Sequence, residues 1–144
     1  MRLTTFSDYT LRVLIYLAVE PGRRATIPEM AAAYGISENH LMKVVHRLAR
    51  SGVIESARGK GGGVRLARDP AAIRLGQVLR ASEGEGPIVE CFSATDSHCR
   101  IAPACRLAKI LDDAFAGLYA TLDAYSVADL VANGKELGPL LARA

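Results

Sequence analysis

The sequence predicts a mainly α-helical protein with one small β-hairpin. Apolar residues recur at helical spacing over much of its 144 residues, and capping signals precede several of these stretches. Two short β-like runs flank a glycine-rich segment near the middle of the chain. Half of the residues are hydrophobic, so the chain can form a core as one domain, or as one small domain with an appendage.

The first predicted helix covers about residues 4–19. Thr5 and Asp8 have the spacing of a capping box at its start. The apolar run Val13–Val19 is too short to cross a bilayer, and no small-residue cleavage site follows it. We therefore expect no membrane span and no signal peptide, and a cytoplasmic location is the default.

A second capping box, Thr26 and Glu29, precedes a short helix over residues 27–34. Gly35 ends this helix, and another helix follows over about residues 37–50. A short helix, a glycine turn and a second helix are typical of a helix-turn-helix.

The helix over residues 37–50 has two distinct sides. Its apolar residues follow i, i+3, i+4 and i+7, which predicts packing against a core. These residues are Leu41, Val44, Val45 and Leu48. The opposite, polar and basic side carries Asn39, His40, Lys43 and Arg47. This side suits DNA recognition, although an ordinary solvated amphipathic helix has the same pattern.

A β-hairpin is predicted directly after this helix, from the runs Val53–Ser56 and Val64–Ala67. The segment between them, ARGKGGG, combines positive charge with glycines that permit a tight turn. A hairpin after a recognition helix is a wing that can contact phosphates or enter the minor groove; the alternative is a plain hairpin with solvated charges. The segment fits neither a P-loop nor a dinucleotide-binding motif, which disfavours a nucleotide-binding loop.

The charge distribution favours DNA as the partner. Residues 1–80 carry 13 Lys and Arg against 6 Asp and Glu, whereas residues 81–144 carry 5 against 9. The net charge of +3 thus combines a basic front and an acidic back, as expected where one end meets a polyanion, although chance variation gives the same result in some chains. The predicted DNA-contacting residues are Ser37, Asn39, His40, Lys43, Arg47, Arg58, Lys60, Gly61, Gly62 and Arg65.

Beyond the hairpin, the sequence predicts a short helix over residues 75–81, an irregular stretch, and a long helix over about residues 104–125. Apolar residues of the long helix alternate by four and three, a spacing suited to a helix–helix seam. They are Leu107, Leu111, Ala114, Leu118, Leu122 and Tyr125. The seam can pack on the chain's own domain or form a homodimer, and palindromic operators favour the homodimer. A short helix near Ser126 and a weakly ordered tail complete the prediction.

All three cysteines, Cys91, Cys99 and Cys105, fall within one short segment. They lack the paired spacing of structural zinc sites, whereas widely spaced thiolates in a loop suit an iron–sulfur cluster. Three thiolates leave one position for another side chain or an exogenous ligand. Cys105 is expected in the first turn of the long helix, where the helix dipole favours a thiolate. The alternatives are a zinc site completed by His98, a thiol redox switch, and cysteines without a function.

The complete prediction is a winged helix-turn-helix DNA-binding domain with a small β-wing, joined to a long dimerisation helix. We expect the DNA-binding domain over residues 1–80 and a cluster-binding loop over residues 81–103. The dimerisation helix and the C-terminal tail are expected over residues 104–144.

Several segments together resemble the Rrf-type iron–sulfur transcription regulators. They are YGISENHLMKVVHRLARSGVI, RGKGGGVRL and CRIAPACRL, and the likeness extends over nearly all of the chain. The stretch HCRIAPACRL is most similar to the nitric-oxide-sensing members. The resemblance implies a cluster-loaded homodimer that binds operator DNA and represses genes for nitric-oxide detoxification until nitric oxide attacks the cluster.

The resemblance also implies a set of ligands. It favours a [4Fe-4S] cluster, with [2Fe-2S] as the other form described for the family. The three thiolates would come from Cys91, Cys99 and Cys105. Asp8 stands where the family has its fourth ligand, an aspartate that reaches across from the other subunit. The rival fourth ligands in this chain are His98, Glu85 and Glu90.

Two other functions stay open. A small redox or electron-transfer protein would explain the cysteines but not the basic helix-turn-helix and wing. The other is a sister regulator that senses iron or cluster supply. Only the family likeness around Cys99–Cys105 distinguishes it from a nitric-oxide sensor in this sequence. An enzyme is not expected, because the three histidines form no evident nucleophile–base–acid series with the available serines and acids.

Overall fold

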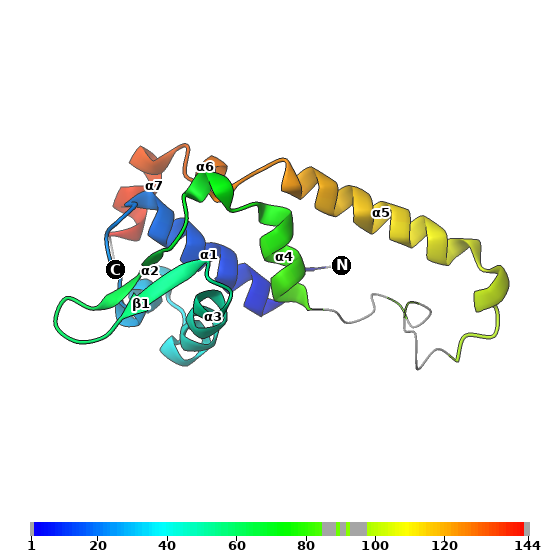
Figure 1. The fold of residues 1–144 in the computed structure, drawn as a ribbon, viewed down its shortest axis with the longest axis horizontal. Coiled ribbons are helices and arrows are strands. Elements are labelled where there is room, and N and C mark those ends of the chain that lie inside the picture. Colours follow the sequence, from blue (N-terminus) through cyan, green and yellow to red (C-terminus); the bar gives the residue numbers. More distant parts are fainter. Residues whose placement is uncertain (1, 85–88, 90–91, 93–97, 143–144) are drawn as a thin grey trace.

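The structure is a computed structural model that describes residues 2–84, 89, 92 and 98–142. Within these residues helices dominate, and two strands form an antiparallel sheet (Figure 1). The elements are α1 (Thr5–Val19), α2 (Ile27–Tyr34), α3 (Glu38–Arg50), β1 (Ile54–Ala57), β2 (Gly63–Leu66), η1 (Pro70–Ala72), α4 (Leu75–Glu83), η3 (Ala102–Ala104), α5 (Arg106–Asp123), α6 (Val127–Leu130) and α7 (Gly134–Leu141). The predicted fold class, mainly α with a small β-wing, is confirmed.

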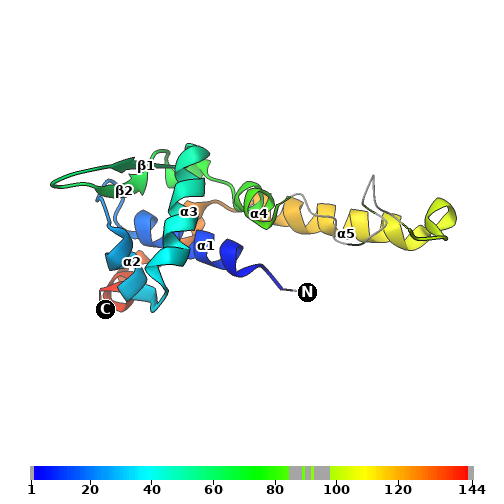
Figure 2. The same cartoon turned by 90° about the horizontal axis from the view of Figure 1, so that it is seen from below.

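The chain forms a head and an arm. The head contains α1 to α4, the β-hairpin, α6 and α7, and the arm contains η3 and α5 (Figure 1). Viewed from below, α3 lies across the front of the head and α5 projects away from it (Figure 2). No helix in the described part of the chain is long and apolar enough to span a membrane.

Helix α1 lies at the centre of the head, where Leu14 is fully buried and the helix contacts α3, α4, α6 and α7. Its N-cap is Thr4, whose hydroxyl oxygen accepts a hydrogen bond from the Ser7 N–H at 3.1 Å. The predicted capping box of Thr5 and Asp8 is therefore wrong. Of two adjacent threonines, the first takes the extended cap conformation and the second already belongs to the helix.

The helix-turn-helix forms as the sequence predicts. In the capping box of α2, the Thr26 N–H donates to Glu29 Oε2 at 2.6 Å, and the Glu29 N–H donates to Thr26 Oγ1 at 3.3 Å. The hydrogen bonds that Glu29 Oε2 accepts from Thr26, first from its N–H and then from its hydroxyl, together with Arg23, hold the pKa of Glu29 below its usual value. Gly35 then ends α2 with a φ of 63°. The core side of α3 is confirmed, since its buried residues are Leu41, Val44, Val45 and Leu48.

The hairpin strands pair in a register that places Glu55 opposite Arg65. The first strand begins one residue later than predicted, and the second begins one residue earlier. Val64 also bridges to Ala25 through two backbone hydrogen bonds of 2.7 and 2.9 Å, which connect β2 to the segment before α2. A Cβ on Gly63 would lie only 2.7 Å from the Ala25 carbonyl oxygen, so this position requires glycine.

The C-terminal residues return to the head. Ser126 and Asp129 form the capping box of α6, and Val127 is fully buried in the core beside α1. The predicted weakly ordered tail is wrong, because α7 forms a helix that contacts α1. The core of the head therefore combines residues from the first 83 positions with residues that follow α5.

Helix α5 has no buried residue, and its contacts with the head are mainly with α4. The half-buried Leu122, which the sequence places in the seam, packs against the core of the head instead. The exposed apolar side chains are Leu107 (59%), Ile110 (59%) and Leu118 (39%), so the uncovered stripe also includes Ile110, which the seam prediction omitted.

Candidate nucleic-acid interface and thiol site

The polar side of α3 faces solvent along its whole length. The DNA-contacting residues predicted on it, Ser37, Asn39, His40, Lys43 and Arg47, are all exposed. The sequence interpretation did not include the other exposed residues of this helix, which are Glu38, Met42, His46 and Arg50. The helical period could have identified His46 and Arg50, because both lie on the outward side. Met42 carried no such signal, because an apolar residue is ordinarily assigned to the core.

Two exposed residues of α3 contact aromatic side chains of α1. The His40 ring lies 6.1 Å from the Tyr9 ring, and the Arg47 guanidinium carbon lies 5.6 Å from the centre of the Phe6 ring. In the part of the chain that the structure describes, no carboxylate forms an ion pair with Lys43 or Arg47. Their charge is therefore available to phosphates.

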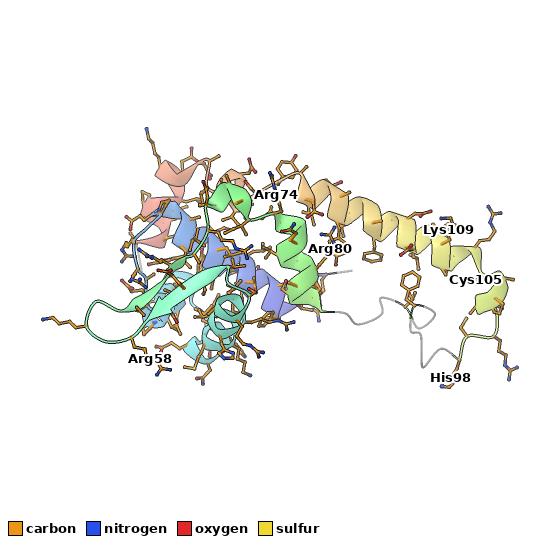
Figure 3. The ribbon with its side chains drawn as sticks, in the orientation of Figure 1. Arg58, Arg74, Arg80, His98, Cys105 and Lys109 are labelled. Atoms are coloured by element: carbon orange, nitrogen blue, oxygen red, sulfur yellow. The ribbon has the colours of Figure 1, made fainter. Side chains whose placement is uncertain are left out.

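The wing carries one paired and two exposed cations. Arg58 and Lys60 lie exposed in the turn of the hairpin, and Figure 3 labels Arg58 beside the hairpin. Arg65 differs, because its Nε lies 2.5 Å from Glu55 Oε1 across the hairpin. Arg65, followed by Arg24 at 3.1 Å, lowers the pKa of Glu55. The sequence interpretation missed this pair, because it depends on the strand register.

The glycines of the turn have a structural reason. Gly61 and Gly62 form the end of the segment before β2, and Gly61 has a φ of 77°. A Cβ on Gly62 would lie 2.5 Å from the Ala57 carbonyl oxygen. These glycines let the backbone turn tightly and leave it close to the surface, where a phosphate can approach it.

The thiol site lies at the far end of the arm. Cys99 and Cys105 are free and half-buried, and Cys91 lies outside the described residues. Two turn hydrogen bonds connect them: the Ala102 N–H donates to the Cys99 carbonyl at 3.2 Å, and the Cys105 N–H donates to the Ala102 carbonyl at 3.3 Å. Figure 3 shows His98 and Cys105 together at this end.

Cys105 is the N-cap of α5 rather than a residue of its first turn. The correction has a cause in the sequence, because Pro103 sits in a short 3₁₀ helix that ends just before Cys105. The thiol still lies at the positive end of the helix dipole, with the exposed Arg100 and Arg106 close in sequence.

Asp8 lies on α1, in an ion pair with Arg12. Its Oδ2 is 3.0 Å from Arg12 Nη2, and both side chains are half-exposed. The Arg12 guanidinium carbon lies 5.9 Å from the Tyr9 ring centre and 5.8 Å from that of Tyr34. The Tyr34 hydroxyl donates to the Arg12 carbonyl at 2.9 Å, and burial raises the pKa of Tyr34 to about 12. Arg12 is therefore well positioned to hold Asp8.

The structure does not bring Asp8 together with the described cysteines. Asp8 lies in the head, whereas Cys105 lies at the distal end of the arm (Figure 3). No group of three His, Cys, Asp or Glu side chains among the described residues is placed to hold a metal ion. The rival ligands Glu85 and Glu90 lie outside the described residues.

The donor chemistry fits an iron–sulfur cluster. Cys99 and Cys105 are uncrosslinked, accessible and held on one short turn, and thiolates are the ligands that such clusters require. Two thiolates leave the other ligand positions of such a cluster to donors outside this turn.

Comparison with known proteins identifies the family. Residues 3–133 match the Rrf2 family, described as an iron-dependent transcriptional regulator. The chain belongs to the Rrf2 family. Among its relatives, the HTH-type transcriptional regulator NsrR of Bacillus subtilis is 47% identical over 142 residues, covering 98% of this chain and 97% of that protein. The regulator of the same name from Geobacillus kaustophilus is 43% identical, with coverage of 98% and 97%.

Solved Rrf2-like structures agree with the fold. The IscR protein of T. potens aligns with a TM-score of 0.74 at 24% identity, over 95% of this chain and 90% of that one. CymR of B. subtilis, the global cysteine regulator, aligns with a TM-score of 0.69 at 28% identity, over 92% and 98%. The predicted family resemblance is confirmed, and this Rrf2 protein is a DNA-binding transcriptional regulator.

Proposed function

We propose that this chain is a homodimeric repressor that binds operator DNA with an iron–sulfur cluster in place and releases the DNA when nitric oxide attacks that cluster. One observation carries the proposal: Asp8 lies in the head, whereas Cys99 and Cys105, which like Asp8 resemble the family's ligands, lie at the far end of the arm. A second copy is then needed to complete the ligand set.

The uncovered stripe of α5 supports the homodimer. Leu107 and Ile110 each expose 59% of their surface, although they lie on a regular amphipathic helix. Exposed apolar stripes of this kind mark interaction sites. A symmetric α5–α5 contact covers both stripes with identical surfaces, as in most homodimers.

Two heads joined in this way present two copies of α3. Asn39, His40 and Lys43 are the residues we assign to base edges, because short polar and basic side chains near the start of a recognition helix read the major groove. Phosphate contacts go to Arg47, Arg58 and Lys60. Arg65 contributes less than the sequence suggests, because Glu55 already neutralises it.

The cluster ligands would be three thiolates and one carboxylate. The thiolates come from Cys91, Cys99 and Cys105, and the carboxylate comes from Asp8 of the second protomer. The resemblance to the family favours a [4Fe-4S] cluster, with [2Fe-2S] as the second form. When bound, the cluster supplies iron that can react with nitric oxide. Reduced thiols are maintained in a reducing cytoplasm, which is where we expect the protein to act.

Asp8 links the cluster to the DNA-binding head. A carboxylate is a harder ligand than a thiolate and would bind such iron less firmly, so Asp8 would be the most weakly held ligand. Without that bond, the head would no longer be fixed to the partner's arm. A coupling of about 1–3 kcal/mol between the two sites lowers operator affinity about 5- to 150-fold.

Anaerobic titration with nitric oxide tests the proposal. Visible absorbance of the reconstituted dimer and its gel shift on operator DNA are recorded in the same samples, and we expect both to fall together. Asp8→Ala should weaken the operator shift of cluster-loaded protein, while Asp112→Ala, an exposed carboxylate on α5, should not. Iron-free protein that binds the operator as tightly as loaded protein, or a cluster that changes without any DNA shift, would contradict the proposal.

A further inference from the structure

The arm is attached to the head through Asp123, near the C-terminal end of α5. Its Oδ2 lies 2.6 Å from Arg80 Nη2 of α4. The Arg80 guanidinium carbon also lies 4.6 Å from the centre of the Tyr119 ring, one helical turn earlier on α5. Figure 3 shows Arg80 between the two helices. Arg80 thus makes an ion pair and a cation–π contact with the same short segment of the arm.

The other carboxylate oxygen of Asp123 has an unusual environment. Oδ1 is buried and makes no hydrogen bond within the described residues. It lies against Gly76 in the first turn of α4, and a Cβ at Gly76 would overlap it. The same Cβ would lie 2.7 Å from the Tyr119 carbonyl oxygen. Gly76 therefore leaves the space into which the carboxylate fits.

The electrostatics of this contact favour a charged carboxylate. The N-cap residue of α4, Arg74, makes no side-chain capping bond. The Asp123 carboxylate instead lies against Gly76 in the first turn, at the positive end of the α4 dipole, without a hydrogen bond to the backbone there. Arg80 first, and then the nearby backbone N–H of Gln77, lower the pKa of Asp123, although the N–H does not reach hydrogen-bonding geometry.

Two backbone hydrogen bonds also connect the residues that follow α5 to the start of α4. The Leu75 N–H donates to the Tyr125 carbonyl at 3.0 Å, and the Val127 N–H donates to the Ile73 carbonyl at 2.9 Å. Within the part of the chain that the structure describes, no α5 residue other than Asp123 forms an ion pair with the head, and the remainder of α5 extends away from it (Figure 1). The direction of the arm is therefore set at its base.

Helix α4 is itself fixed to α1. The buried hydroxyls of Ser7 and Ser82 lie 2.8 Å apart, and Glu83 Oε1 accepts a hydrogen bond from the Thr4 N–H at 2.8 Å. Since α1 also packs against α3, a rigid path leads from the arm through α4 and α1 to the recognition helix.

We infer that Asp123, held by Arg80 and accommodated by Gly76, is a positioning residue that sets the spacing between the two recognition helices of the dimer. The inference rests on the proposed dimerisation through α5 and on operator binding. The 18 residues of α5 span about 27 Å at about 1.5 Å per residue. Tilting such a lever by about 10° moves its far end by about 5 Å, which exceeds the rise of one base pair, about 3.4 Å.

Operators with altered spacing test the inference. An operator is first selected by the wild-type dimer from random duplexes, and its two half-sites are then moved apart or together by one and two base pairs. We expect wild type to bind one spacing at least tenfold more tightly than the others. Asp123→Asn and Gly76→Ala should lose this preference or shift its optimum, while their affinity for a single half-site and their dimerisation stay as in wild type.

The controls separate the inference from the proposed function. Gly134→Ala introduces the same methyl group where nothing lies within 4 Å, and it should keep the wild-type spacing profile. Asp123→Asn preserves the size of the side chain and so decides the outcome if Gly76→Ala does not fold. Folded variants with the wild-type spacing profile would overturn the inference and leave the proposed function standing. A wild-type protein that selects no paired half-sites would overturn both.

Discussion

Replacing Ile110 with serine should separate dimerisation from folding. Ile110 lies on the exposed stripe of α5, outside the core of the head, and 59% of its surface is accessible in the single chain. The substitution removes apolar surface that a second protomer would cover, and it leaves the contacts of the head intact.

The size of the effect follows from this exposure. Complete burial of an isoleucine side chain is worth about 1.5–3 kcal/mol, so covering the exposed part recovers about 0.9–1.8 kcal/mol per protomer. Two protomers contribute about 2–3.5 kcal/mol to the dimer. At about 1.4 kcal/mol for each factor of ten, Ile110→Ser should weaken dimerisation about 25- to 300-fold.

Analytical ultracentrifugation over a dilution series measures the dimer dissociation constant, and circular dichroism confirms that the head remains folded. Ala116→Ser is the matched control, because Ala116 is exposed on the opposite side of α5. Operator affinity at low protein concentration should fall with the dimer population. An unchanged dissociation constant in folded Ile110→Ser protein would show that this stripe is not the interface.

Two further predictions concern the head. Lys60→Gln should weaken binding to all DNA sequences similarly, as measured by fluorescence anisotropy. It should also reduce the slope of log affinity against log salt by about 0.9 for each phosphate that Lys60 neutralises. Weaker binding to one operator alone would contradict the phosphate assignment. Thr26→Ala should lower the free energy of unfolding by about 1 kcal/mol in urea titrations. Because the pKa of Glu29 is lowered in the folded state, the stability of this capping box is present above its unfolded value of 4.5 and is lost as the pH falls through the folded pKa. A difference between wild type and Thr26→Ala that does not shrink below pH 4.5 would refute the assignment.

Residue spacing in the sequence predicted those elements whose stabilising contacts lie between nearby residues. The capping box at Thr26 and the core side of α3 needed only the sequence spacing, because both depend on residues within one or two turns of each other. The start of α1 was misplaced by one residue, since Thr4 and Thr5 offer the same hydroxyl and only the backbone conformation selects one.

Tertiary packing decided the elements that the sequence missed. Helix α7 contains Gly138 and Pro139, which both disfavour helix, and its contact with α1 supplies the stability that local propensity lacks. The pair of Arg80 and Asp123 joins residues 43 positions apart, so no spacing rule could identify it. In the proposed dimer the ligand set would need a second protomer, which a single-chain pattern does not contain.

The proposed role of Asp8 as a ligand has to be compatible with its ion pair to Arg12. A half-exposed pair of this kind is worth at most about 1 kcal/mol, so Arg12 would not prevent Asp8 from binding iron in the proposed dimer. In the single chain Arg12 gives Asp8 a defined partner, with its guanidinium near the Tyr9 and Tyr34 rings. Under the proposal, Asp8 would exchange one specific partner for the other when the cluster is lost. A small change in the stability of the iron bond would then move the population between the bound and the released arrangement of the heads.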